Sequence, residues 1–159
     1  FKCDWSSDVG SSDLIVEQLT IRGGRSNGNG GGILNQGCNL VVRGQSALID
    51  NQETGQGGGL WSNAPVVLED AAVRDGKASQ GAGVWTSANT LVRTSSILAN
   101  EATGSSNDRG GAAIYATGDL TVDRGAISLD DAAGYNPDGL LRGLVDDTEL
   151  DGGHRLHGA

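Results

Sequence analysis

A motif of small residues followed by an aliphatic and then a larger residue occurs four times in this chain. The copies read Gly31-Gly32-Ile33-Leu34, Gly58-Gly59-Leu60-Trp61, Ala82-Gly83-Val84-Trp85 and Ala112-Ala113-Ile114-Tyr115. A second motif follows each: apolar residues at i and i+2 (Thr90 replaces one), a further aliphatic residue, and Asn, Gly or Asp three residues later. Its third members are Leu48, Val73, Ile97 and Ile127, and an earlier, partial instance of the motif has Ile21 at this position. From Ile21 onward these residues lie 27, 25, 24 and 30 residues apart. A repeat constrains the fold strongly, because each unit must adopt a similar structure.

Each repeat unit has the pattern of several short strands. Apolar residues at i and i+2 place one face of a strand in a core, and the Gly, Asn and Asp residues between the runs supply tight turns. Such a unit cannot bury its own apolar face, so successive units must stack, at roughly 4.8 Å per layer, around one continuous core. The sequence therefore predicts an all-β fold, a parallel β-solenoid of about four to five coils.

The composition agrees with a turn-dense repeat and excludes other classes. The 159 residues include 27 glycines but only 2 prolines, without a glycine at every third position, which excludes collagen. The formal net charge of −9 argues against a nucleic-acid partner, which needs clustered Lys and Arg. No apolar run has the length of a membrane-spanning helix. Cys3 and Cys38 are too few for a disulfide framework or a cysteine-rich zinc site, and we predict neither a metal nor a cofactor.

Two stretches of the repeat carry a family resemblance. The segments GGGIL…LVV…LIDN and GGAAIY…LTVDRGAISLDD resemble coils of bacterial right-handed parallel β-helix proteins of the pectin-lyase-like kind, in particular those with polymorphic-outer-membrane-protein-type repeats. The resemblance covers about residues 14–131 and implies a single-stranded, right-handed parallel β-helix. That family usually has an aromatic residue before the Asn that ends a coil. This chain instead has Leu48, Val73, Ile97 and Ile127 at that core position, which leaves the subfamily open.

The repeat divides the chain into three segments. Residues 1–13 resemble the peptide produced when sequencing-adapter DNA is translated in frame, with Gly10 where that peptide has Cys. We therefore expect a non-native leader there, the alternative being an ordinary polar cap. Residues 14–131 are the β-helix coils. Residues 132–159 break the repeat and have a turn composition at 135–139, so we expect an irregular acidic tail or an end cap.

The larger residues of the first motif are the candidate binding site. Leu34, Trp61, Trp85 and Tyr115 each follow the aliphatic residue of the motif, so they point to the opposite face of the strand. Stacked coils would align them in a column on the surface. Because exposed aromatic rows mark binding surfaces, we predict that Trp61, Trp85 and Tyr115 bind a partner. The alternative is a structural role, in which the rings stack on one another and shield the strand edges.

Polar residues at the coil ends and in the tail suggest other roles. Asn51, Gly76, Asn100 and Asp130 recur at one turn, where we expect a structural hydrogen-bonded ladder, with binding as the alternative. Polysaccharide-cleaving β-helix enzymes use closely spaced carboxylates, and the residues here that invite comparison are Asp130, Asp131, Asp146, Asp147 and His154. Hydrolysis needs two carboxyls across one bond, whereas neighbours in a strand point to opposite faces. We therefore predict no catalytic residue.

These features favour a structural or adhesive passenger in an extracellular or cell-surface location, associated with an outer membrane as the resemblance implies. Its expected partners are surface glycans and host or neighbouring proteins. The alternatives are a polysaccharide lyase or glycoside hydrolase of pectin-lyase-like fold, and a non-catalytic glycan-binding module. Neither end resembles a designed cap, so we also expect the strand edges to be able to pair with another copy.

Overall fold

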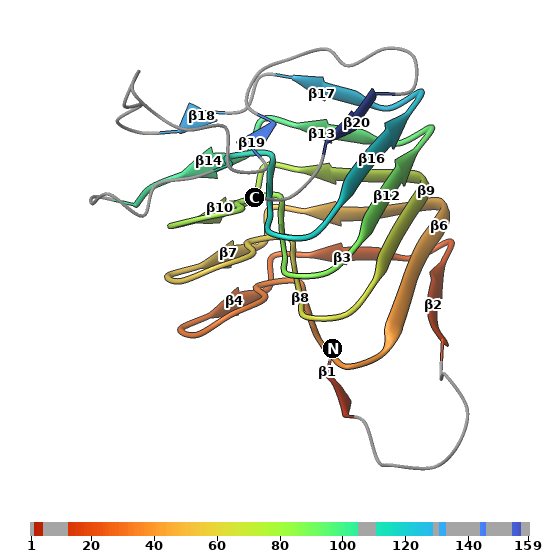
Figure 1. The fold of residues 1–159 in the computed structure, drawn as a ribbon. Coiled ribbons are helices and arrows are strands. Elements are labelled where there is room, and N and C mark those ends of the chain that lie inside the picture. Colours follow the sequence, from red (N-terminus) through yellow and green to blue (C-terminus); the bar gives the residue numbers. More distant parts are fainter. Residues whose placement is uncertain are drawn as a thin grey trace.

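The computed structural model describes residues 13–104 and 111–127 with their side chains, and the backbone alone at 2–4, 128, 131–132, 144–145 and 154–156. Most of the predicted leader and tail therefore lies outside the described residues. Within them the chain is all-β and has no helix (Figure 1). Accordingly, no described helix could cross a membrane. The strands stack as a parallel β-solenoid of about four turns, which confirms the predicted fold class.

Three parallel sheets form the sides of the solenoid. The first sheet contains β5 (Ile33–Gln36), β8 (Leu60–Ser62), β11 (Val84–Thr86) and β15 (Ile114–Ala116). The second sheet contains β2 (Asp13–Glu17), β3 (Thr20–Arg22), β6 (Asn39–Ile49), β9 (Val66–Arg74), β12 (Thr90–Arg93), β13 (Ser96–Leu98), β16 (Leu120–Asp123) and β17 (Ala126–Ser128). The third sheet contains β4 (Arg25–Ser26), β7 (Gln52–Glu53), β10 (Lys77–Ala78), β14 (Glu101–Ala102) and β18 (Asp131–Ala132). The chain visits the three sheets in turn and then climbs to the next coil (Figure 1).

Three further strands pair at the two ends of these sheets. Strand β1 (Lys2–Asp4) lies parallel to β5. At the other end, β19 (Leu144–Val145) pairs antiparallel with β15, and β20 (His154–Leu156) pairs antiparallel with β16. The parallel register of the coils thus gives way to antiparallel pairing after the last coil.

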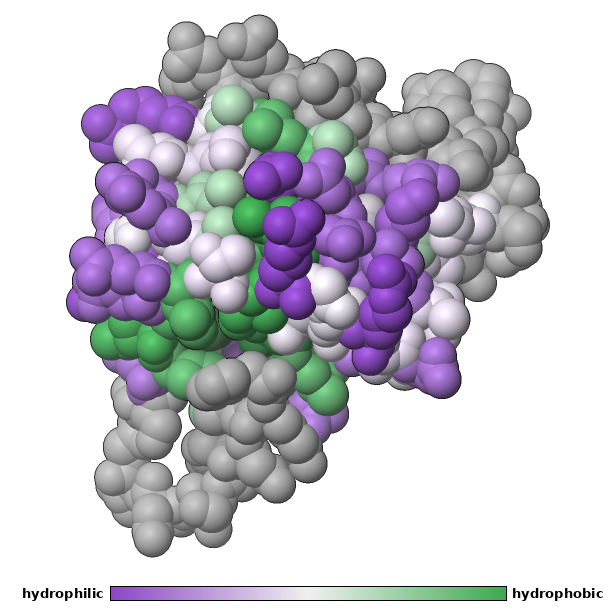
Figure 2. Space-filling model, turned by 180° about the vertical axis from the view of Figure 1, so that it is seen from behind, coloured by the Kyte–Doolittle hydropathy of each residue, from purple (hydrophilic) through white to green (hydrophobic). Residues whose placement is uncertain are grey.

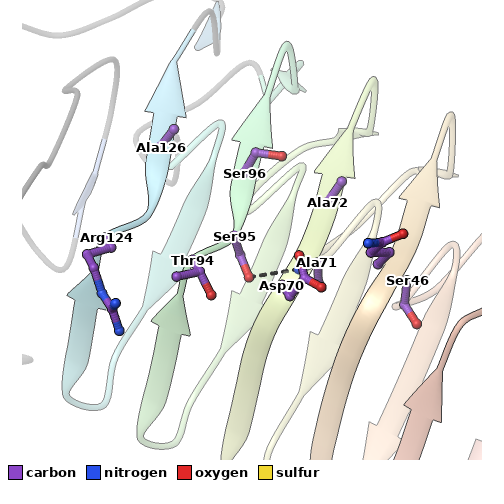
Figure 3. Close-up of a pocket in the computed structure, with 10 residues that line it drawn as sticks. Ser46, Asp70, Ala71, Ala72, Thr94, Ser95, Ser96, Arg124 and Ala126 are labelled. Carbon is purple, nitrogen blue, oxygen red and sulfur yellow. Dashed lines mark hydrogen bonds between the residues drawn. The ribbon is translucent and has the colours of Figure 1, made fainter.

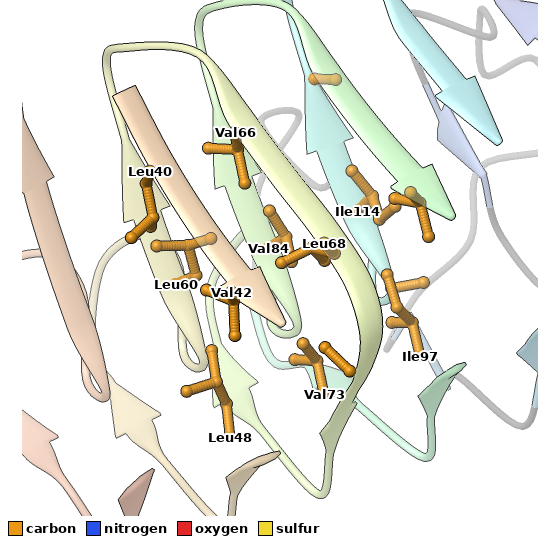
Figure 4. Packing of buried hydrophobic residues seen from close by; sticks show 14 of the residues in the cluster. Leu40, Val42, Leu48, Leu60, Val66, Leu68, Val73, Val84, Ile97 and Ile114 are labelled. Carbon is orange, nitrogen blue, oxygen red and sulfur yellow. The ribbon is translucent and has the colours of Figure 1, made fainter. Parts of the chain in front are cut away.

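The core consists of one aliphatic residue stacked on the next from coil to coil. In the first sheet, Ile33, Leu60, Val84 and Ile114 are in register and all fully buried. The second sheet adds inward columns through Leu40 and Val66, through Val42 and Leu68, and through Leu48, Val73 and Ile97 (Figure 4). The structure therefore confirms the inward positions assigned from the repeat. Cys38, at the turn between the first and second sheets, is buried and disulfide-bonded.

A bend divides the second sheet into two faces. Strands β6 and β9 cross the bend without interruption, whereas the later coils break into β12 and β13, and into β16 and β17. At the bend of each coil, one residue other than glycine adopts a positive φ, which side chains with a Cβ rarely allow. These residues are Gln18 (52°), Gln45 (65°), Asp70 (50°), Thr94 (44°) and Arg124 (54°). Their left-handed backbone turns the strand, with Gly44 (63°) beside Gln45 in the second coil, at a steric cost that is largest for a β-branched side chain.

Thr94 is therefore a site at which a substitution should stabilise the protein. We expect Thr94→Asn to raise the free energy of unfolding by about 0.5–1 kcal/mol, because Asn tolerates the left-handed region better than a β-branched residue does. Urea unfolding followed by circular dichroism measures the change. Thr117→Asn is the matched control, since Thr117 is also exposed but is not among the described residues with positive φ. Equal effects of the two substitutions would contradict the strain at Thr94.

Candidate functional site

The predicted aromatic column is formed by three strands of the first sheet. Trp61 on β8 pairs with Trp85 on β11, which pairs with Tyr115 on β15, and Leu34 on β5 continues the column below Trp61. The inward neighbours in these strands fill the core, so the four larger side chains face outward and are half-buried. The structure thus brings together the three residues predicted from the sequence. We call Leu34, Trp61, Trp85 and Tyr115 the aromatic column.

The rings of the aromatic column stack along the solenoid axis. The ring centroids of Trp61 and Trp85 are 5.1 Å apart with an interplanar angle of 2°, and those of Trp85 and Tyr115 are 6.2 Å apart with an angle of 12°. Contacts of this kind contribute roughly 0.5–1.5 kcal/mol each beyond the area they bury. Because Trp85 is stacked between Trp61 and Tyr115, the edge of its ring is the part that a partner can contact. Mutual stacking, the structural interpretation, is present, and binding by the same residues stays a prediction.

Two glutamines from the turn before the first sheet support Trp61 but not Trp85. The indole Nε1 of Trp61 donates a hydrogen bond to Oε1 of Gln56 at 3.3 Å. The side-chain Nε2 of Gln56 in turn donates to Oε1 of Gln80 in the next coil at 2.9 Å. The indole Nε1 of Trp85 is buried and has no hydrogen-bond partner among the described residues. Among the described residues, the column is therefore a ridge held by ring stacking and by the contacts of Gln56 with Trp61 and Gln80.

Two members of the predicted coil-end ladder, Asn51 and Asn100, hold backbone turns, whereas Asp130 lies outside the described residues. Asn51 and Asn100 are buried, and each bridges to the coil below. Oδ1 of Asn51 accepts from the backbone N of Gly24 at 2.9 Å, and its Nδ2 donates to the carbonyl of Ile21 at 3.0 Å. Oδ1 of Asn100 accepts from the backbone N of Gly76 at 3.0 Å, and its Nδ2 donates to the carbonyl of Val73 at 3.3 Å. Asparagine therefore alternates with glycine at this turn.

The residues considered for polysaccharide cleavage are described only in part. Asp130, Asp146 and Asp147 lie outside the described residues. The backbone places Asp131 opposite Glu101 in the third sheet and His154 opposite Val122 in the second sheet. Among the residues with described side chains, no three His, Cys, Asp or Glu residues gather in a way that could hold a metal ion. The structure thus puts the backbones of Asp131 and His154 in different sheets.

The sequence reasoning missed a groove along the bend of the second sheet. The groove has a volume of about 420 Å³, and its lining includes Asp70, Thr94 and Arg124 at the bend and Ala72, Ser96 and Ala126 after it (Figure 3). Gln45 also lines it. The buried hydroxyl of Ser95 accepts from the backbone N of Ala71 at 3.0 Å and donates to the carbonyl of Arg93 at 2.8 Å. That hydroxyl supports the backbone at the bend. The groove could have been expected from the sequence, because small residues recur directly after the bend in successive coils.

An alternating ladder of charges on the second sheet was also missed. Its members, one per coil, are Glu17, Arg43, Glu69, Arg93 and Asp123. Arg43 contacts Glu17 at 3.2 Å, and Arg93 contacts Glu69 at 3.5 Å and Asp123 at 3.3 Å. Because these side chains are 36–49% exposed, each pair contributes at most about 1 kcal/mol. The ladder could have been predicted by aligning the repeats, because each of its charged residues directly follows the second apolar position of the second motif.

Comparisons of this chain with protein-family models, with curated proteins and with solved structures gave no match. The fold is therefore known from the structure itself.

Proposed function

We propose that this chain is a structural or adhesive segment of a passenger displayed outside the cell, on a bacterial β-helix of the pectin-lyase-like kind with polymorphic-outer-membrane-protein-type repeats. The observation that carries the adhesive role is the aromatic column, which presents three stacked rings on one outer face of the solenoid. Stacked rings lose little conformational freedom when a partner binds, because their rotamers are already fixed. The expected partners are surface glycans and proteins that lie along the axis.

The hydrogen bonds made by the buried polar side chains support a structural role for this chain. Glu53 is only 6% exposed, and its carboxylate accepts from the backbone N of Gly28 at 3.2 Å and of Gly55 at 2.5 Å. The hydroxyl of buried Ser62 accepts from Nδ2 of buried Asn35 at 2.8 Å. Asn51 and Asn100 hold turns in the same way. Apart from the buried Oδ1 of Asn35, which has no hydrogen-bond partner among the described residues, these groups bond to the backbone or to one another, as a rigid framework requires.

A binding assay with column variants tests the adhesive role. We expect the chain, immobilised on beads, to bind members of a panel of surface glycans and extracellular proteins, and Trp61→Ala with Trp85→Ala to weaken that binding at least tenfold, because the ridge then loses its central rings. Val41→Ala with Val67→Ala is the matched control on an outer face of the second sheet. Unchanged binding by the tryptophan variant would refute the role of the column.

Two further measurements separate the proposal from its rivals. Antibodies against the chain should label intact cells of the source organism, as expected for display outside the cell. Incubation with polygalacturonate and similar acidic glycans, with and without Ca²⁺, should release no product. Cleavage of such a polymer would favour a lyase or hydrolase in place of an adhesive scaffold.

A further inference from the structure

The groove along the bend of the second sheet is built from small residues of successive coils. Ala72, Ser96 and Ala126 are in register on β9, β13 and β17. Each directly precedes a buried core residue of its strand, so each faces outward. No side chain in this row is larger than serine, and the groove there has a volume of about 420 Å³, so a ligand can approach the strands closely. We call Ala72, Ser96 and Ala126 the small row.

A second row of side chains follows the groove on the bend itself. Asp70, Thr94 and Arg124 stand one per coil and are exposed, and Figure 3 shows them beside the small row. Gln45 occupies the same position in the coil before them. Because successive coils are about 4.8 Å apart, the backbones of Asp70 and Arg124 are separated by roughly 10 Å along the axis. We call Gln45, Asp70, Thr94 and Arg124 the bend row.

The polar groups of the bend row are available to a ligand. The charged residues directly before it form the alternating ladder and are paired with one another. By contrast, the side chains of Gln45, Asp70 and Thr94 make no hydrogen bond or ion pair to any residue that the structure describes. Arg124 contacts Asp123 at 3.3 Å, but its side chain is 65% exposed, which leaves guanidinium N–H groups for a ligand. The groove thus offers both donors and acceptors, and the carboxylate of Asp70 is without a partner among the described residues.

These groups do not suit a protein or a polyanion. The backbone at the bend is already paired between coils, as in the hydrogen bond from the N of Ala126 to the carbonyl of Ser95 at 2.9 Å, so a peptide strand finds no edge to extend. The large hydrophobic residues that the described part of the chain leaves exposed are Ile15 and Leu19, in the first coil. Figure 2 shows hydrophobic residues gathered toward the lower end of the solenoid, where Figure 1 places that coil. The groove therefore lacks the apolar anchors of a protein interface, and Asp70 together with the formal net charge of −9 repels a polyanion.

A sugar chain without charge matches the groups that are present. A carboxylate accepts hydrogen bonds at both of its oxygens, so Asp70 can bind two neighbouring hydroxyls of one ring. The guanidinium of Arg124 donates to hydroxyl or ring oxygens, and the hydroxyls of Thr94 and Ser96 both donate and accept. The alanines of the small row leave room for a ring against the sheet, and the stacking of coils lets a linear chain follow the axis.

We propose that this groove binds an uncharged, linear glycan that lies along the solenoid axis, with its rings over the small row and its hydroxyls on the bend row. The inference rests on the proposed function only in that both have surface glycans as partners. The groove belongs to the second sheet and the aromatic column to the first, so each can bind or fail to bind without the other.

Isothermal titration calorimetry on the full chain tests the site, with maltohexaose, cellohexaose, laminarihexaose and mannohexaose as neutral probes and hexagalacturonate as the charged comparison. We expect a neutral probe to bind, and Asp70→Asn to raise its dissociation constant about tenfold, because the hydroxyls lose a charged acceptor. Asparagine tolerates the left-handed backbone of this position, so the fold is kept. Glu69→Gln is the matched control: it removes the same charge directly outside the groove and should leave the dissociation constant unchanged. Binding of none of the neutral probes would overturn the proposal.

A substitution in the small row tests where the glycan lies. We expect Ala72→Tyr to abolish binding of the neutral probe, because the ring fills the groove, whereas Val67→Tyr adds the same ring to an outward position of β9 outside the groove and should leave binding intact. Circular dichroism shows whether both variants keep the β fold. If Trp61→Ala with Trp85→Ala abolishes binding and Ala72→Tyr does not, the glycan lies on the aromatic column, which refutes the groove and leaves the proposed function standing. Hexagalacturonate that binds as tightly as the neutral probe would refute an uncharged ligand.

Discussion

Replacing Asn100 with leucine is expected to lower the free energy of unfolding by about 3 kcal/mol, one of the largest losses from any single side chain of this protein. The amide of Asn100 satisfies the backbone N of Gly76 and the carbonyl of Val73, and both contacts are buried. Leucine has the same number and branching of side-chain heavy atoms but can neither accept nor donate a hydrogen bond. Each buried backbone group that loses its partner costs about 1–3 kcal/mol.

The same substitution at Asn51 is the natural control. Asn51 makes the equivalent contacts to Gly24 and Ile21, but these contacts are only part-buried because they lie in the first coil. Water can replace the lost partner there, so Asn51→Leu should cost about 1 kcal/mol. Urea unfolding followed by circular dichroism measures both variants. Equal losses at the two positions would mean that the cost does not arise from buried, unpaired backbone groups.

The repeat predicted these asparagines as a structural ladder because their position in the unit is fixed by the core residue three places earlier. Asn51 follows Leu48 by three residues, as Asn100 follows Ile97. The hydrogen-bond partners of these asparagines could not be predicted from the spacing. The amides do not bond to one another. Each bonds to a glycine turn in the coil below, where an added Cβ at Gly24 or Gly76 would come within 3.0 Å of the asparagine Oδ1. The alternation of Gly and Asn is thus a packing requirement between coils.

The aromatic column could be predicted because alternation along a strand fixes the side of each residue. Once Leu60 and Val84 are assigned to the core, Trp61 and Trp85 must face outward. The orientation of the rings did not follow from this argument. It depends on the distance between coils and on Gln56, which comes from a different part of the unit and holds Trp61.

The bend of the second sheet could not be predicted from the sequence, for a different reason. Positive φ at Asp70, Thr94 and Arg124 has no local signal, since none of these residues is a glycine and Thr disfavours that conformation. The stacked coils impose it, because each strand must turn where its neighbours turn. The groove along the bend is a consequence of that geometry together with the small residues Ala72 and Ser96. Local propensity was overridden by the tertiary structure.

The alternation of inward and outward residues predicts a large difference between two adjacent positions of β9. Leu68 is fully buried and Val67, its neighbour, faces outward and is half-buried. Leu68→Ala removes buried methyl groups and leaves a cavity between Val42 and Val92, which stand in the same column. We expect it to lower the free energy of unfolding by about 3 kcal/mol. Val67→Ala leaves the core intact and should cost less than about 1 kcal/mol.

Chemical denaturation measures the free energy of unfolding that each variant loses. The prediction is that Leu68→Ala loses more than Val67→Ala. A one-residue slip of register would exchange the two faces of every strand in the solenoid. In that case Val67→Ala would be the costly substitution, and Leu91 and Val41, its partners in register, would be core residues as well. A larger loss at Val67 would therefore contradict the stacking of the coils on which the aromatic column and the charge ladder both depend.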